Sequence, residues 1–177
     1  MYYGQNNVDE SPKILLYGYG NPGRKDDGLG PVLVDEIEQW IIRQGIRNVS
    51  VDSNYQLNIE DAYTIQDYDI ILFMDASIED IDEYIITRVI PSDKVNYTMH
   101  SVSPSFVLHL CNTIYRKVPS TFLLHIKGYA FDLQEGLTDG ARKNMEAASD
   151  FLKGLLQDQD RLLDNIEPFC SINGFTG

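Results

Sequence analysis

Short apolar runs alternate along this chain with longer segments in which apolar residues recur every three or four positions. Runs of the first kind predict buried strands, and segments of the second kind predict helices with one buried face. The strands are expected at Lys13–Tyr19, Val49–Asp52, Asp69–Met74, Glu83–Ile90 and Thr121–Lys127. The helices are expected from Gly28 to a stop at Gly45, over Gln56–Tyr68, over Pro104–Arg116 behind an N-cap at Ser103, and from Thr138 onward.

The predicted order, β-α-β-α-β-β-α-β-α, indicates one α/β domain with three layers. Such alternation produces a mostly parallel, twisted sheet with helices on both faces. A length of 177 residues suits a single domain. We expect the domain to cover residues 12–166, with a flexible N-terminal lead over 1–11 and a C-terminal tail over 167–177.

Charge and composition exclude several kinds of partner. The chain has 27 acidic against 14 basic residues and a net charge of −13, whereas binding to phosphate backbones depends on clustered Lys and Arg. No apolar run approaches the roughly 20 residues needed to span a bilayer, and the N-terminus lacks the basic and apolar regions of a secretory signal. We therefore expect a cytoplasmic protein without nucleic-acid or membrane partners, and Cys111 and Cys170 fit a reducing compartment.

Candidate chemistry is expected where strands end, because sites in open α/β sheets form beyond the carboxyl ends of the strands. Asp26 and Asp27 follow the first strand, Asp75 follows Asp69–Met74, and His100 comes at some distance after Glu83–Ile90. Two carboxylates and an imidazole suit a borderline divalent ion such as nickel, zinc, iron or manganese. Three protein ligands would leave coordination positions open.

Structural roles for the same residues remain open at this point. One of Asp26 and Asp27 is expected to complement the dipole of the following helix, and Asp75 could serve structure as readily as chemistry. His109 and His125 lie among apolar residues of a predicted helix and a predicted strand, where a structural role is more common than metal ligation.

Two other motifs are weaker. Gly18-x-Gly20-x-x-Gly23 resembles a dinucleotide fingerprint, but Pro22 and the charged segment 24–27 occupy the place where a phosphate-binding helix would begin. His100 with Ser101 or Ser103 could suggest a nucleophilic hydrolase, yet the chain has no Gly-x-Ser-x-Gly elbow.

Four motifs in order resemble the hydrogenase maturation proteases, the nickel-dependent endopeptidases that trim the C-terminus of [NiFe]-hydrogenase large subunits. The similarity covers about 13–156. It comprises Gly18-Tyr19-Gly20-Asn21-Pro22…Asp26-Asp27-Gly28-Leu29-Gly30, Asp75-Ala76, His100-Ser101-Val102-Ser103-Pro104, and Gly128-Tyr129-Ala130-Phe131…Glu135-Gly136-Leu137-Thr138.

The resemblance implies a phosphorylase/hydrolase-like fold and a hydrolase that acts as an aspartyl-type peptidase in hydrogenase maturation. It places the metal ligands at Asp27, Asp75 and His100. The nickel is expected to arrive on the precursor large subunit, and zinc or cadmium could replace it in vitro. Residues expected to contact the substrate are Gly20, Asn21, Asp26 and Gln56.

The chain also departs from the family pattern. Gln134 stands where many members have glycine and Lys127 where many have arginine, and both differences touch the pocket edge at most. The segment Tyr55-Gln56-Leu57…Glu60 resembles the branch that serves soluble, NAD-linked hydrogenases. The resemblance assigns no catalytic residue beyond the metal ligands.

Two alternative functions remain. Peptidyl-tRNA hydrolases also begin with a strand and Gly-x-Gly-Asn-Pro-Gly, but this chain lacks their histidine-bearing segment after that motif, and its charge of −13 does not suit tRNA. A non-catalytic homologue that only binds the nickel-loaded subunit would keep the same three ligands.

Overall fold

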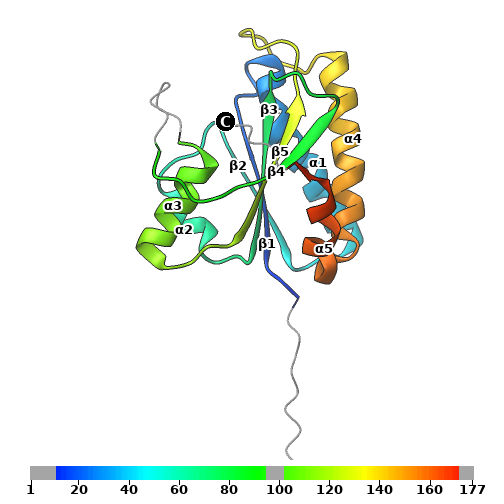
Figure 1. Cartoon of the computed structure of the whole chain (residues 1–177). Coiled ribbons are helices and arrows are strands. Elements are labelled where there is room, and N and C mark those ends of the chain that lie inside the picture. Colours follow the sequence, from blue (N-terminus) through cyan, green and yellow to red (C-terminus); the bar gives the residue numbers. More distant parts are fainter. Residues whose placement is uncertain (1–10, 95–101, 172–177) are drawn as a thin grey trace, which may run out of the picture.

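A six-stranded sheet forms the centre of the molecule in the computed structural model, which describes residues 11–94 and 102–171 (Figure 1). The strand order is β2-β1-β3-β5-β4-β6. The strands are β1 (Ile14–Tyr19), β2 (Val49–Asn54), β3 (Ile70–Ser77), β4 (Tyr84–Arg88), β5 (Ser120–Lys127) and β6 (Cys170–Ser171).

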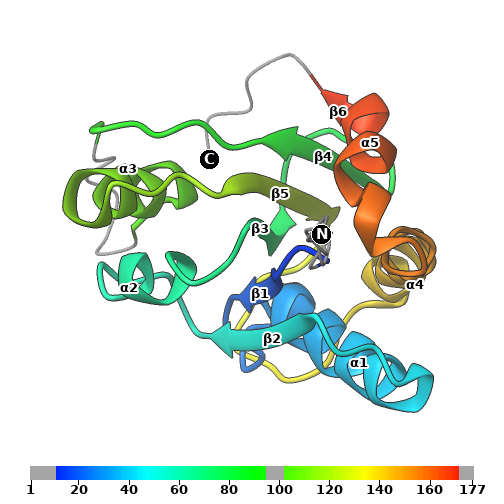
Figure 2. The same ribbon diagram turned by 90° about the horizontal axis from the view of Figure 1, so that it is seen from below.

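Helices cover both faces of this sheet. One face carries α1 (Leu29–Gln44), α4 (Asp139–Leu156) and α5 (Leu162–Ile166), and the other carries α2 (Asp61–Ile65) and α3 (Pro104–Tyr115), as the view along the strands shows (Figure 2). Single-turn 3₁₀ helices occur at η1 (Lys25–Gly28), η2 (Gln159–Arg161) and η3 (Glu167–Phe169). The predicted three-layer α/β class and the predicted order of elements are confirmed.

Alternating residues of β1 belong to two separate cores. Ile14 and Leu16 pack with the side chains of α1, α4 and α5, whereas Leu15 and Tyr17 pack with those of α2 and α3. A strand that is apolar on both faces reads as a continuous apolar run, which is the pattern expected of a parallel strand covered by helices on both sides. None of the described helices combines the length and apolar character needed to cross a bilayer.

Local sequence signals set several helix ends as predicted. Gly45 ends α1 in the left-handed conformation at φ 68°, which glycine adopts without steric cost. The Ser103 hydroxyl accepts a hydrogen bond from the Phe106 N–H at 3.3 Å and caps α3. Thr138 caps α4 in the same way, through the Ala141 N–H at 3.2 Å.

The direction of β4 differs from the expectation that the loop after it would lie at the carboxyl edge. β1, β2, β3 and β5 are mutually parallel, but β4 pairs antiparallel with β5, so Arg88 lies opposite Phe122 at the other end of the sheet. The chain then returns, and the Ser92 N–H donates to the Ser105 carbonyl at 3.0 Å beside the first turn of α3. The sequence pattern of a short β-branched run carries no information on strand direction.

The bounds of several other elements differ from the predicted ones. The helix expected over 56–68 is only α2, and β3 continues to Ser77, so that Asp75 lies within the strand. The fold extends past the expected domain end at 166, because β6 pairs with β4 through Ile86 and Cys170. Residues 1–10 of the expected lead and 172–177 of the expected tail lie outside the described residues.

Candidate functional site

The carboxyl edge of the four parallel strands gathers those predicted site residues that the structure describes. The loop after β1 supplies residues 20–28, the loop after β2 supplies 55–60, β3 ends close to Asp75, and the loop after β5 supplies 128–138. These segments are far apart in sequence and meet because parallel strands all end at the same edge.

Asp27 is held in η1 by the turn that precedes it. The Asn21 N–H donates to Asp27 Oδ2 at 3.0 Å. Gly20 has φ +133°, and a Cβ added there would lie 1.9 Å from the Asp27 carbonyl oxygen. Only glycine fits this close approach of the two backbones, so Gly20 is needed for the position of Asp27.

Asp75 lies half-buried near the end of β3. The Ala76 N–H donates to Asp75 Oδ1 at 2.8 Å, and the Tyr19 hydroxyl also hydrogen-bonds to this carboxylate. Burial, together with a smaller contribution from the negative charge of Asp27, raises the pKa of Asp75 to about 7 against the lowering effect of these hydrogen bonds. Asp27 and Asp75 therefore lie within electrostatic reach of each other.

This pair of carboxylates fits a cation. Burial and a neighbouring like charge both disfavour ionisation of Asp75, and a divalent ion would offset both. The described residues contain no group of three or more His, Cys, Asp or Glu side chains that could hold a metal, so Asp27 and Asp75 supply at most two ligands there. The third expected ligand, His100, lies outside the described residues, and Ser103 is the N-cap of α3.

Asp26 has a different role from the one expected. Its carboxylate is fully buried and accepts hydrogen bonds from four donors: the N–H groups of Tyr129, Ala130 and Thr138, and the Thr138 hydroxyl, at 2.7–3.0 Å. With both oxygens engaged and no exposed surface, Asp26 joins η1 to the loop after β5. This engagement argues against the substrate contact that the resemblance implied for Asp26.

The other residues expected to contact the substrate lie around the same edge. Asn21 Oδ1 accepts from the Gly23 N–H at 2.9 Å, which shapes the turn after β1. Gln56 is exposed in the loop after β2, where its carbonyl accepts from the Asn58 side chain at 3.2 Å.

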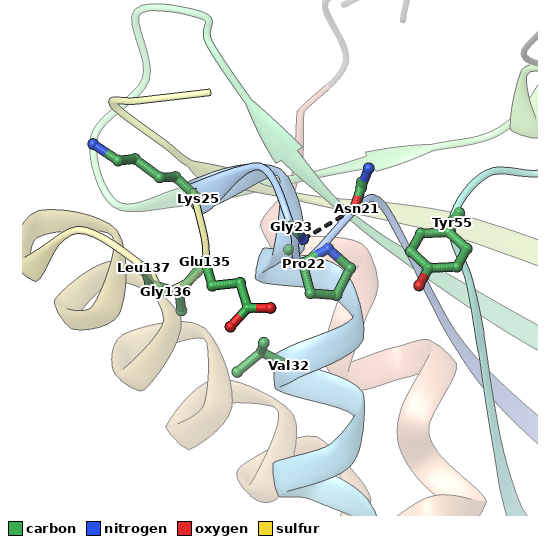
Figure 3. Close-up of a pocket in the computed structure, with 10 residues that line it drawn as sticks. Asn21, Pro22, Gly23, Lys25, Val32, Tyr55, Glu135, Gly136 and Leu137 are labelled. Carbon is green, nitrogen blue, oxygen red and sulfur yellow. Dashed lines mark hydrogen bonds between the residues drawn. The ribbon is translucent and has the colours of Figure 1, made fainter. Parts of the chain in front are cut away.

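A hollow of about 350 Å³ opens beside this turn (Figure 3). Its lining comes from the turn after β1, the first turns of α1, Tyr55 and the loop before α4: Asn21, Pro22, Gly23, Lys25, Gly28, Val32, Tyr55, Glu135, Gly136 and Leu137. A second hollow shares Pro22 and Tyr55 with the first and is otherwise lined by Gly20, Pro31, Asp35, Ser53 and Asn54. Sequence reasoning gave Glu135 no role, although Glu135-Gly136-Leu137 belongs to one of the motifs that carried the resemblance.

The two residues that depart from the family pattern, Gln134 and Lys127, each contact a different loop. The Gln134 carbonyl accepts from the Lys25 N–H, and Gln134 forms an isolated parallel bridge with Arg24. Both contacts use the backbone, so they do not depend on the side chain. Lys127 Nζ contacts the Glu79 carbonyl, outside the hollow beside the turn.

The structure describes the environment of two histidines, His125 and His109. His125 is buried in β5, with Nε2 2.9 Å from the Thr87 hydroxyl oxygen, and burial lowers its pKa to about 4. His109 lies in α3, stacked on Phe106 with ring centroids 6.1 Å apart. Neither belongs to the pair formed by Asp27 and Asp75.

Solved structures share this architecture. A [NiFe] hydrogenase maturation protease HycI from Thermococcus kodakarensis is similar with a TM-score of 0.67 and 16% identity, covering 85% of this chain and 97% of that one. The hydrogenase maturating endopeptidase HybD from E. coli gives a TM-score of 0.64 and 19% identity over 82% and 93%. HybD from Thermococcus kodakarensis gives 0.59 and 19% over 81% and 99%.

The chain has the fold of the [NiFe]-hydrogenase maturation proteases. No family model matches its sequence, and no curated protein matches it either. At identities below 20% these three likenesses establish the fold, and they agree with the resemblance carried by the four motifs.

Proposed function

We propose that this protein is an endopeptidase that removes a C-terminal peptide from the precursor large subunit of a [NiFe]-hydrogenase. The observation that carries the proposal is the pair formed by Asp27 and Asp75. The two carboxylates reach the same sheet edge from different strands, and Asp27 acts on the pKa of Asp75. The fold around them is shared with solved hydrogenase maturation proteases.

Nickel enters this proposal as part of the substrate. Asp27, Asp75 and His100 would bind nickel that the precursor already carries, so that the metal marks the subunit as ready for cleavage. When bound, such an ion can polarise a carbonyl or activate water. The residues of this chain orient the two carboxylates: the Asn21 N–H holds Asp27, and the Ala76 N–H and the Tyr19 hydroxyl hold Asp75.

The free cysteines and the acidic net charge accord with a protein substrate in the cytoplasm. Both cysteines are free, which accords with a reducing compartment. A net charge of −13 disfavours nucleic acid, which argues against the peptidyl-tRNA hydrolase alternative.

The test is mass spectrometry of a precursor large subunit before and after incubation with this protein. We expect loss of one C-terminal peptide from precursor purified with nickel, and no loss from precursor purified without it. Equal cleavage of both forms would show that the metal is not the recognition element. An intact precursor in a stable complex would identify a binder without catalysis.

Variants test the ligand set. His100→Ala and Asp75→Asn are expected to abolish processing of the nickel-loaded precursor while the protein stays folded. His109→Ala, in α3, serves as the control and should process normally. Normal cleavage by His100→Ala would refute its role as a ligand.

A further inference from the structure

The loops that form the hollow beside the turn after β1 are fixed by the fold. The Lys25 N–H donates to the Gln134 carbonyl, and Asp26 holds both ends of the segment 129–138. Lys25 has a positive φ of 48° and Gly136 has φ 91°. A non-glycine residue in the left-handed region persists only where the surrounding contacts impose it, so the walls of this hollow are held in one arrangement.

Glu135 brings an unpaired negative charge to this hollow. Figure 3 shows its carboxylate turned toward Val32 and Pro22. Within the described part of the chain, the ion pairs do not include Glu135. Lys25 also lines the hollow, but its ammonium points away (Figure 3) and lies 3.9 Å from Asp132 Oδ2.

The remaining lining combines apolar and aromatic side chains with polar groups. Pro22 and Val32 lie beside the Glu135 carboxylate, Leu137 also lines the hollow, and Tyr55, which is 70% exposed, lies on the far side of Pro22 (Figure 3). A volume of about 350 Å³ lies at the lower end of ligand pockets and suits a side chain with its flanking backbone. Long basic side chains bury an apolar stem while presenting a charged head, and an aromatic ring beside that head adds a cation–π contact.

We propose that this hollow binds an arginine or lysine side chain of the polypeptide substrate, with Glu135 as the anionic partner and Tyr55 as the aromatic wall. The hollow lies next to the expected metal-binding carboxylate, because Gly28 in its lining directly follows Asp27 and the Asn21 N–H donates to Asp27. A basic residue bound there would align an extended peptide across the carboxyl edge. The inference rests on the proposed function for the identity of the polypeptide, but binding of the basic group can be tested without it.

The first experiment is an NMR titration of the full-length protein with N-acetyl-arginine amide. We expect saturable shifts of the amide signals of Gly23, Gly28 and Gly136. N-acetyl-citrulline amide, which has the same shape without the charge, should bind about two- to fivefold more weakly, the upper range for one charge pair with an exposed partner such as Glu135.

Glu135→Gln removes the charge and keeps the size of the side chain. The variant should lose the preference for arginine over citrulline. Glu146→Gln, an exposed change on α4 with the same effect on net charge, should retain it. Equal binding of the two amides by the unmodified protein, or shifts spread over the whole acidic surface, would overturn the proposal.

Processing kinetics separate this inference from the proposed function. With nickel-loaded precursor, Glu135→Gln should raise KM about two- to fivefold and leave kcat unchanged, since a lost uniform binding contact acts on KM. An unchanged KM would refute the role of Glu135 while leaving the peptidase proposal intact. If the unmodified protein does not cleave the precursor, the peptidase proposal fails, and the titration still decides whether the hollow binds a basic group.

Discussion

Asp26 accepts two hydrogen bonds from Thr138, a residue 112 positions away, through its N–H at 2.7 Å and its hydroxyl at 2.8 Å. Thr138 is also the N-cap of α4. The buried carboxylate thus connects η1, which carries Asp27, to the start of the longest helix. Stability and the geometry of the candidate site depend on the same contact.

Replacement of Asp26 by Asn is expected to lower the free energy of unfolding by about 2–4 kcal/mol. The amide nitrogen of Asn would face N–H donors that now have a carboxylate acceptor, and a buried unpaired polar group is costly. Urea unfolding at pH 7 measures the loss, with Asp150→Asn on the exposed side of α4 as the control. A difference below about 0.5 kcal/mol between the two variants would contradict the structural role.

This destabilisation should depend on pH. Burial by itself raises the pKa of Asp26, but the N–H groups of Thr138, Tyr129 and Ala130 and the Thr138 hydroxyl outweigh it, so the pKa is lowered. A lowered pKa in the folded state contributes stability above the unfolded value, 3.8, and this contribution is lost as pH falls through the folded pKa. The difference in the free energy of unfolding between Asp26→Asn and the unmodified protein should therefore become smaller below pH 4. Urea unfolding across that pH range measures this difference.

Asp75→Asn is expected to stabilise the fold at pH 8 while abolishing processing. The pKa of Asp75 is about 7 in the folded protein against an ordinary value of 3.8, so the folded state binds the proton more tightly. Stability then falls as pH rises from about 4 to 7, and the full cost is present above pH 7. We expect a gain of roughly 1–3 kcal/mol at pH 8 and almost none near pH 4, measured by urea unfolding; a destabilised variant at pH 8 would contradict this.

The pH dependence of stability that His125 contributes should have the opposite sign to that of Asp75. Its pKa is lowered from 6.5 to about 4 by burial, so the unfolded state binds the proton more readily between these values. Stability is lost as pH falls from 6.5 toward 4, by up to about 3 kcal/mol. Over much of this range Asp75 changes the free energy of unfolding in the opposite direction. The loss of stability on acidification should therefore be clearest in the Asp75→Asn variant. Adding His125→Gln to that variant should make its stability nearly independent of pH between 6.5 and 4.

Gly30→Ala is expected to destabilise the protein by about 2 kcal/mol or more. The added Cβ would lie 2.4 Å from the Met74 carbonyl oxygen and 2.6 Å from that of Tyr19, so α1 would have to move away from β1 and β3. Gly154→Ala in α4 is the matched control, because its Cβ meets nothing within 4 Å. That change should stabilise by about 0.5–1 kcal/mol, and thermal unfolding of both variants tests the contrast.

Local features of the chain could be predicted because their causes are local. Ser103, Thr138 and Gly45 set helix ends through bonds and backbone angles within a few residues, and sequence reasoning identified all three. The two faces of β1 follow from its continuous apolar run, and the alternation of strands and helices predicted the three-layer fold. The meeting of Asp27 and Asp75 at one edge follows from parallel strand order alone.

Contacts between distant segments decided the rest. The resemblance assigned the ligand role to Asp27, but only the donors of Tyr129, Ala130 and Thr138 determine that Asp26 is the buried member of the pair. The antiparallel direction of β4 and the pairing of β6 depend on which edge of the sheet is free once β5 has formed. The position of Glu135 in a hollow depends on Lys25 and Gly136 in two separate loops. A carboxylate acquires its role from the donors and charges around it, and in this protein those come from segments that only the folded chain brings together.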